Sequence, residues 1–167
     1  MNCDASEQLP FFVYGTLIPG QTNDHLWQDG IRGVETAVLT NGRLYDMGYY
    51  PMLVLEGSGT VQGKLITVAS GCYGEILKCL DDLEGYIPDQ PSKSTYMRLK
   101  RGVTTDDGRK ALSWVYVGRP DYVGDTELIA CGDWIDYAAG LSSQLDSWWE
   151  NVITVHELHD GMKGGRS

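Results

Sequence analysis

The segment 73–84, YGEILKCLDDLE, carries the carboxylate best placed for acid–base chemistry. At about 100° per residue, a helix over this segment has one apolar arc that we expect to be buried. The arc contains Ile76, Leu77, Leu80 and Leu83. Glu84 falls inside the arc, Asp81 falls at its edge, and Asp82 falls on the opposite, solvated side. Burial raises the pKa of a carboxyl group, so Glu84 is a candidate for proton transfer near neutral pH. The alternative is that Glu84, in the last turn, bends out into water.

A second candidate site is the tetrapeptide Tyr14-Gly15-Thr16-Leu17, which follows the short apolar run 10–14. A strand that ends in glycine and continues into a loop exposes consecutive backbone N–H groups. Such groups can bind a carboxylate or an oxyanion without a basic side chain. Because strand–glycine–turn segments are common, the alternative is a purely structural turn.

The sequence offers no motif for a metal, a cofactor or an enzyme nucleophile. His156 and His159 stand three residues apart but lack the HExxH pattern of zinc enzymes. Neither Ser113 nor Ser147 lies in a GxSxG context, and no glycine-rich phosphate loop is present. The cysteines show neither a CxxC pair nor zinc spacing, so we expect reduced thiols. They are Cys3, Cys72, Cys79 and Cys131.

The composition indicates an acidic, ordinary globular protein of 167 residues, with 23 Asp and Glu against 13 Lys and Arg and a net charge of −10. This balance disfavours binding to nucleic acid and to anionic membranes, which both favour positive charge. No apolar run approaches the roughly 20 residues of a membrane span. The polar N-terminus resembles neither a signal peptide nor a basic transit peptide. We therefore expect a cytoplasmic protein.

The pattern of apolar and turn residues predicts an α+β fold in a single domain, 1–167, with a core over about 10–140 and an extension over 141–167. Strands are expected at 10–14, 34–45, 50–55, 60–68, 95–104 and 109–118. Helices are expected at 23–27, with Thr22 or Asn23 as cap, and at 73–84, 131–137 and 142–159. Asn41-Gly42 predicts a hairpin within 34–45, and 105–108 predicts a second hairpin. Gly85 is expected to end the helix 73–84.

Several segments together resemble the gamma-glutamylcyclotransferase-like superfamily, which includes avirulence-induced-like proteins. The segment 14–17, YGTL, with Pro19-Gly20 is similar to its N-terminal signature, and 80–86, LDDLEGY, is similar to the segment that bears its catalytic glutamate. The other similar segments are GRLYDMGYYP at 42–51, YMR at 96–98, WVY at 114–116 and GDWIDY at 132–137. These segments occur in the family's order. The resemblance covers residues 11–137 and does not extend to 141–167.

The resemblance implies a small, closed or nearly closed mixed β-barrel with flanking helices and a cavity between the 14–17 loop and Glu84. It also implies the cyclisation of a small γ-glutamyl amine or peptide to 5-oxoproline, with release of the amine. Glu84 would be the catalytic general acid/base, and the amides of Gly15, Thr16 and Leu17 would bind the glutamyl end. We expect Tyr14, Tyr86 and Tyr116 to line the cavity. The substrate's own α-amine is the nucleophile, so this reaction needs no metal or cofactor.

Two other functions remain open at this point. One is a non-catalytic binding or regulatory protein that keeps the barrel and its cavity. The other is an enzyme of the same fold that acts on another amide, for example by removing a γ-glutamyl protecting group. In 141–167, an apolar stripe that includes Leu145, Trp148 and Trp149 predicts a helix that docks on the barrel, with a homodimer contact as the alternative.

Overall fold

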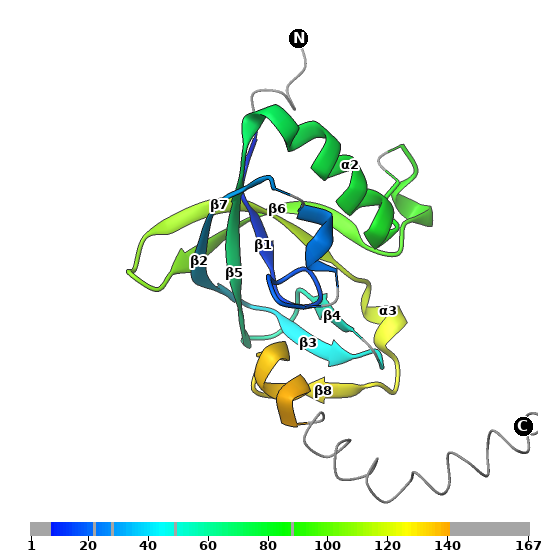
Figure 1. The fold of residues 1–167 in the computed structure, drawn as a ribbon. Helices are drawn as coiled ribbons and strands as arrows, with labels where there is room; N and C mark the ends of the chain where they lie inside the picture. Colours follow the sequence, from blue (N-terminus) through cyan, green and yellow to red (C-terminus); the bar gives the residue numbers. More distant parts are fainter. Residues whose placement is uncertain (1–7, 22, 28, 49, 88, 141–167) are drawn as a thin grey trace, which may run out of the picture. The chain divides into compact units, whose positions relative to one another are not determined.

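The computed structural model describes residues 8–21, 23–27, 29–48, 50–87 and 89–140, and it contains a closed β-barrel and a small second sheet (Figure 1). The strands are β1 Phe11–Val13, β2 Ile31–Thr40, β3 Arg43–Asp46, β4 Pro51–Val54, β5 Thr60–Val68, β6 Met97–Thr105, β7 Lys110–Val117 and β8 Glu127–Ile129. The α-helices are α2 Tyr73–Glu84 and α3 Pro120–Val123, and the 3-10 helices are η1 Asp24–Trp27, η2 Ser70–Cys72 and η3 Pro91–Lys93.

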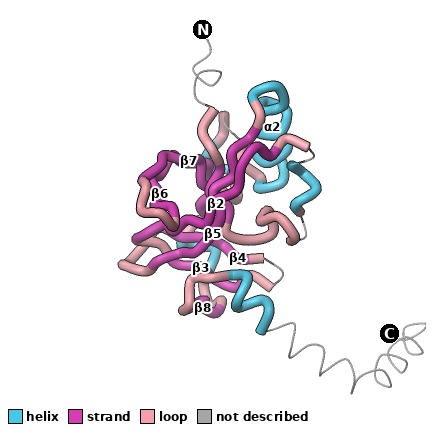
Figure 2. Tube along the Cα trace, turned by 60° about the vertical axis from the view of Figure 1, so that its left-hand side comes forward, coloured by secondary structure: helices cyan, strands magenta, loops and turns pink. Residues whose placement is uncertain are grey.

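The barrel strands follow the order β1-β5-β2-β6-β7. Within the described ranges, neighbouring barrel strands run antiparallel except β1 and β7, which are parallel and close the barrel with Phe11 opposite Trp114. This confirms the small mixed barrel that the sequence resemblance implied. In both Figure 1 and Figure 2, α2 lies near one end of the barrel and β8 lies near the other.

Burial explains why the short apolar segments form strands. All three residues of β1 and all four residues of β4 are buried. The predicted hairpin of β6 and β7 is confirmed, with Thr104 opposite Lys110 next to the turn. Helix α2 spans 73–84 as expected, and Gly85 ends it with φ 69°, a left-handed conformation that glycine adopts without steric cost.

The predicted hairpin at Asn41-Gly42 is wrong. The chain does turn there, with Asn41 at φ 62°, but β2 and β3 do not pair with each other. Strand β2 pairs with β5 from Ile31 to Thr40 and with β6 on its other edge, whereas β3 pairs with β4 and β8. Both edges of β2 are therefore occupied, and the turn carries the chain from the barrel into the second sheet.

The sequence patterns also missed two short elements, α3 and β8. Helix α3 has only four residues and β8 only three, and the first two residues of β8 are exposed. Such short segments carry no readable periodicity. Strand β8 completes the second sheet, whose order is β4-β3-β8.

The chain divides into two compact units, Met1–Trp134 and Ile135–Ser167. Residues 134–140 are helical, so the helix expected at 131–137 begins three residues late. The expected helix at 142–159, with His156, His159 and the tryptophan pair, lies outside the described residues. None of the described helices is long and apolar enough to span a membrane.

Candidate active site

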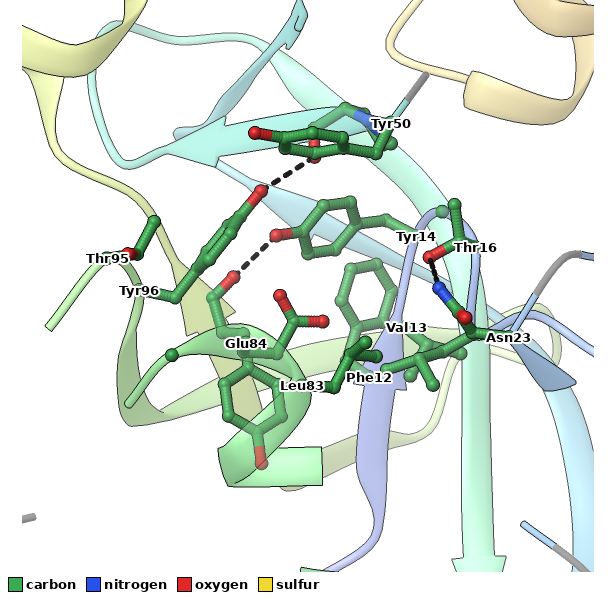
Figure 3. A pocket seen from close by; sticks show the side chains of 15 residues that line it. Phe12, Val13, Tyr14, Thr16, Asn23, Tyr50, Leu83, Glu84, Thr95 and Tyr96 are labelled. Atoms are coloured by element: carbon green, nitrogen blue, oxygen red, sulfur yellow. Dashed lines mark hydrogen bonds between the residues drawn. The ribbon is translucent and has the colours of Figure 1, made fainter. Parts of the chain in front are cut away.

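One pocket of about 580 Å³ opens where β1, β4 and the end of α2 meet (Figure 3). Its described lining combines aromatic and apolar side chains with a few polar groups. The lining residues are Phe12, Val13, Tyr14, Gly15, Thr16, Leu17, Asn23, Tyr50, Pro51, Leu83, Glu84, Gly85, Thr95, Tyr96 and Tyr116. Five of the predicted binding residues, Tyr14, Gly15, Thr16, Leu17 and Tyr116, therefore lie together with Glu84.

The loop after β1 is held through its carbonyl groups. The Gly15 carbonyl accepts a hydrogen bond from the Ile18 N–H at 3.0 Å, and the Thr16 carbonyl accepts one from the Asn23 N–H at 2.8 Å. The indole Nε1 of the buried Trp27 donates to the Leu17 carbonyl at 2.7 Å. In contrast, the N–H groups of Gly15, Thr16 and Leu17 donate to no group among the described residues. Three consecutive donors thus remain available in the pocket wall.

Gly15 is required because Pro51 lies against it. A Cβ atom at position 15 would lie 2.6 Å from Cγ and 2.8 Å from Cδ of the Pro51 ring. A glycine therefore lets the loop approach β4, so that the two walls of the pocket meet.

Asn23, which was expected to cap a helix, instead stabilises the loop. Its side-chain amide donates to the Thr16 hydroxyl at 2.9 Å (Figure 3). Because the Thr16 oxygen accepts this bond, its hydroxyl proton remains able to donate.

Glu84 is the last residue of α2, and the turn at Gly85 fixes its position. The Gly85 N–H donates to the Asp82 carbonyl at 3.2 Å, and the Tyr86 N–H donates to the Asp81 carbonyl at 2.9 Å. The chain is held on its other side by the Thr95 N–H, which donates to the Gly85 carbonyl at 3.0 Å. Burial raises the pKa of Glu84 from its ordinary value of 4.5 to about 7. In Figure 3 the Glu84 carboxyl group points into the pocket rather than out into water.

Two tyrosine hydroxyls lie near the Glu84 carboxyl group (Figure 3). Tyr14 donates to the Tyr116 carbonyl at 2.6 Å, and Tyr96 donates to the Pro51 carbonyl at 3.0 Å. The pKa values of the Tyr14 and Tyr96 hydroxyls are raised, mainly by burial and to a lesser extent by neighbouring acidic groups that include Glu84. Both tyrosines therefore remain neutral and protonated. Tyr96 was not predicted as a site residue, although its place at the start of the YMR segment was a usable signal.

The arc predicted for α2 needs two corrections. Leu83 is 41% exposed because it lies at the pocket rather than in the core. Asp81, expected at the edge of the arc, is buried and bonded to Arg98 and to the Tyr116 hydroxyl. The ion pair with Arg98 compensates the free-energy cost of burying the Asp81 carboxylate. The periodicity of apolar residues does not reveal such a pair.

Tyr86, the remaining predicted binding residue, is not among the described residues that line this pocket. Its ring lies 5.2 Å from the Arg98 guanidinium carbon instead. The left-handed turn at Gly85 separates Tyr86 from the helical direction that brings Glu84 into the pocket.

The described residues contain no group of three or more His, Cys, Asp or Glu side chains that could hold a metal ion. Cys72, Cys79 and Cys131 are free thiols, and none of them lines the pocket. The described pocket therefore offers one carboxyl group, that of Glu84, and the hydrogen-bonding groups of the loop.

The sequence matches a known class of proteins, the gamma-glutamyl cyclotransferases. The family model described as gamma-glutamyl cyclotransferase, AIG2-like, matches residues 11–136, and the chain belongs to this family.

A named relative supports the same class. The gamma-L-glutamyl-butirosin B gamma-glutamyl cyclotransferase of Niallia circulans is 32% identical over 141 residues, which cover 81% of this chain and 83% of the relative. The match to the family model and the name of this relative together support a cyclotransferase-type function.

Solved structures share the fold. YkqA from Bacillus subtilis matches with a TM-score of 0.61 and 23% identity, and the match covers 81% of this chain but 42% of YkqA. This chain therefore spans less than half the length of YkqA. An AIG2-like protein from Mus musculus matches with a TM-score of 0.51 and 28% identity, over 68% of this chain and 81% of that protein.

Proposed function

We propose that this protein cyclises a γ-glutamyl amide to 5-oxoproline and releases the amine, with Glu84 as the general acid/base. The observation that carries the proposal is the place of Glu84: its carboxyl group lies in a pocket that is also lined by Gly15, Thr16 and Leu17, whose N–H groups donate to no group among the described residues. The name of the Niallia circulans relative supports the same type of reaction.

The glutamyl end of the substrate is a zwitterion, and the pocket offers one partner for each charge. The N–H groups of Gly15, Thr16 and Leu17 would bind the α-carboxylate, as consecutive backbone donors bind anions elsewhere. The α-ammonium would lie against Glu84 and the oxygens of Tyr14 and Tyr96. This arrangement folds the substrate so that its α-nitrogen approaches its own γ-carbonyl carbon, and binding in this conformation removes the entropy cost of restricting the bonds between them.

Glu84 then moves protons between the two nitrogens. Its carboxylate accepts a proton from the α-ammonium, and the neutral amine attacks the γ-carbonyl carbon to close a five-membered ring. Glu84 returns the proton to the leaving nitrogen as the amide bond breaks. Two protons leave the α-nitrogen overall, and the released amine departs as an ammonium ion. A pKa of about 7 suits both directions of transfer.

The experiment is incubation of purified protein with a panel of γ-glutamyl compounds, with 5-oxoproline detected by mass spectrometry. Glu84→Gln keeps the size of the side chain but removes its ability to carry a proton, so turnover should fall by about 10²-fold or more. Asp82→Asn is the matched control, because Asp82 lies two residues away with a side chain that is 71% exposed. Turnover by Glu84→Gln equal to that of wild type would disprove the assignment, and absence of 5-oxoproline from every compound would disprove the function.

A further inference from the structure

The last turn of α2, residues 81–84, carries Glu84 but contains no buried apolar side chain. Asp82 and Leu83 are exposed, and the fully buried apolar residues of α2 all precede this turn. The most buried residue of the turn is Asp81, which is 8% exposed. The position of Glu84 therefore depends on what holds Asp81.

Asp81 attaches the end of α2 to two strands of the barrel. Arg98 on β6 and Tyr116 on β7 lie directly opposite each other in the sheet. Arg98 donates to the Asp81 carboxylate from Nε at 2.8 Å and from Nη2 at 3.2 Å. The Tyr116 hydroxyl donates to Oδ1 of the same carboxylate at 2.6 Å. One carboxylate thus fixes the helix end at two neighbouring strands.

The same connections extend to the surroundings of Glu84. The Asp81 carbonyl accepts the Tyr86 N–H at 2.9 Å, so Asp81 also stabilises the turn that follows Glu84. Glu84 lies three residues after Asp81, which is about 4.5 Å along the helix axis. The Tyr116 carbonyl accepts the Tyr14 hydroxyl at 2.6 Å, and Tyr14 lies near Glu84 in the pocket (Figure 3).

Asp81 and Arg98 themselves are not among the described residues that line the pocket. They therefore have no place from which to touch a substrate, and any effect on the reaction passes through Glu84. Their opposite charges also cancel, so the pair as a whole adds no net charge beside Glu84.

We propose that Asp81 and Arg98 are positioning residues, whose ion pair fixes the last turn of α2 on the barrel and keeps the Glu84 carboxyl group inside the pocket. The consequence for catalysis rests on the proposed function.

The position of Glu84 has a direct signature in its pKa. Burial raises this pKa to about 7, so a helix end that moves toward water lowers it toward the ordinary value of 4.5. A role in stability alone leaves the pKa in the folded protein unchanged.

Other titratable groups surround Glu84, and none of those in the described lining is a second carboxylate or a cation. Burial raises the pKa of three of the four tyrosine hydroxyls there, Tyr14, Tyr96 and Tyr116. The fourth is Tyr50, which precedes β4. Asp81 on α2 and Arg98 on β6 are the charged groups next to this lining, and a test must remove both together to leave the net charge unchanged.

The test variant is therefore the double substitution Asp81→Asn with Arg98→Met. It removes both charges of the pair, and the asparagine oxygen can still accept the Tyr116 hydroxyl. Titration of the Glu84 carboxyl carbon by carbon-13 NMR, assigned with Glu84→Gln, should give a pKa below about 6 instead of about 7. Turnover per folded molecule should fall by about tenfold to 10²-fold, because small misplacements of a reacting group have effects of this size.

The matched control is the double substitution Lys78→Met with Asp82→Asn. It removes the same two charges from an exposed ion pair that lies within α2 and does not reach the barrel. The pKa of Glu84 and the turnover should stay at their wild-type values. Arg98→Lys is a second test variant that keeps both charges but loses the two-point contact, so it should lower the Glu84 pKa in the same direction by less.

The outcomes separate this inference from the proposed function. A wild-type Glu84 pKa and wild-type turnover in the folded Asp81→Asn/Arg98→Met protein would overturn the positioning role while the reaction stands. If that protein does not fold, the same result in Arg98→Lys overturns it. If wild-type protein forms 5-oxoproline from no γ-glutamyl compound, the proposed function fails, and the Glu84 pKa in these variants still decides whether the pair holds the carboxyl group in the pocket.

Discussion

Replacing Arg98 by methionine is expected to destabilise the protein strongly, because Arg98 is the cation that neutralises the buried Asp81. The two side chains are 10% and 11% exposed. Arg98 donates from Nε to Asp81 Oδ1 at 2.8 Å and from Nη2 to Oδ2 at 3.2 Å, and the Tyr116 hydroxyl donates to Oδ1 at 2.6 Å. Methionine keeps the apolar stem but leaves the Asp81 carboxylate with the Tyr116 hydroxyl as its one hydrogen-bond donor in the described part of the chain.

The magnitude follows from burial. Removing one partner of a buried ion pair costs about 3–5 kcal/mol, because the other charge is left uncompensated. The Arg98 guanidinium carbon also lies 4.4 Å from the centre of the Trp114 ring, a contact worth about 1 kcal/mol that methionine only partly replaces. Against a typical unfolding free energy of about 5–15 kcal/mol, this loss is large. At about 2–4 °C per kcal/mol, the melting temperature should fall by about 6–20 °C.

Urea unfolding, followed by tryptophan fluorescence, measures the effect. Lys78→Met is the matched control, since it removes the cation of an exposed ion pair with Asp82, the neighbour of Asp81 on α2. The side chains of Lys78 and Asp82 are 78% and 71% exposed. An exposed pair of this kind contributes about 0–1 kcal/mol. Asp81→Asn in the Arg98→Met background should recover part of the loss by removing the unpaired charge. An Arg98→Met protein within about 0.5 kcal/mol of wild type would refute the role assigned to this pair.

Three further results are expected. Burial raises the pKa of Glu84 to about 7, so the folded protein binds the Glu84 proton more tightly than the unfolded chain does. The free energy of unfolding therefore falls as the pH rises from about 4.5 to 7. Glu84→Gln should therefore be more stable than wild type at pH 8, by up to about 3 kcal/mol, and should lose this advantage near pH 4; equal denaturation curves at both pH values would contradict the burial. Gly15→Val places its side chain against Pro51 and should abolish binding of a γ-glutamyl amide in calorimetry, whereas normal binding would reduce the loop to a structural turn. Truncation after Gly140 should lower solubility or melting temperature and leave turnover per folded site unchanged; an inactive but folded truncation would place residues 141–167 in the substrate site.

Local sequence signals predicted the elements that carry the site. The apolar spacing of 73–84 and the glycine after it defined α2 at both ends, because helix periodicity and a left-handed end are properties of adjacent residues. The same spacing placed Glu84 inside the apolar arc, with a bend out into water as the alternative, and the short apolar runs predicted β1, β4 and β5. The barrel itself was predicted from the resemblance to a family, because the similar segments occur in the same order along the chain.

Only the tertiary structure decided how these elements pair and which polar groups compensate one another. Asn41-Gly42 has the residues of a hairpin turn, but β2 had better partners elsewhere in the chain. The Tyr14 hydroxyl meets the Tyr116 carbonyl 102 residues away, and Arg98 meets Asp81 across 17 residues. Such contacts depend on barrel closure and leave no periodic trace in the sequence. They also determine that the Tyr14 and Tyr96 hydroxyls donate to backbone carbonyls, which no residue type reveals by itself, because a hydroxyl group donates or accepts according to its neighbours.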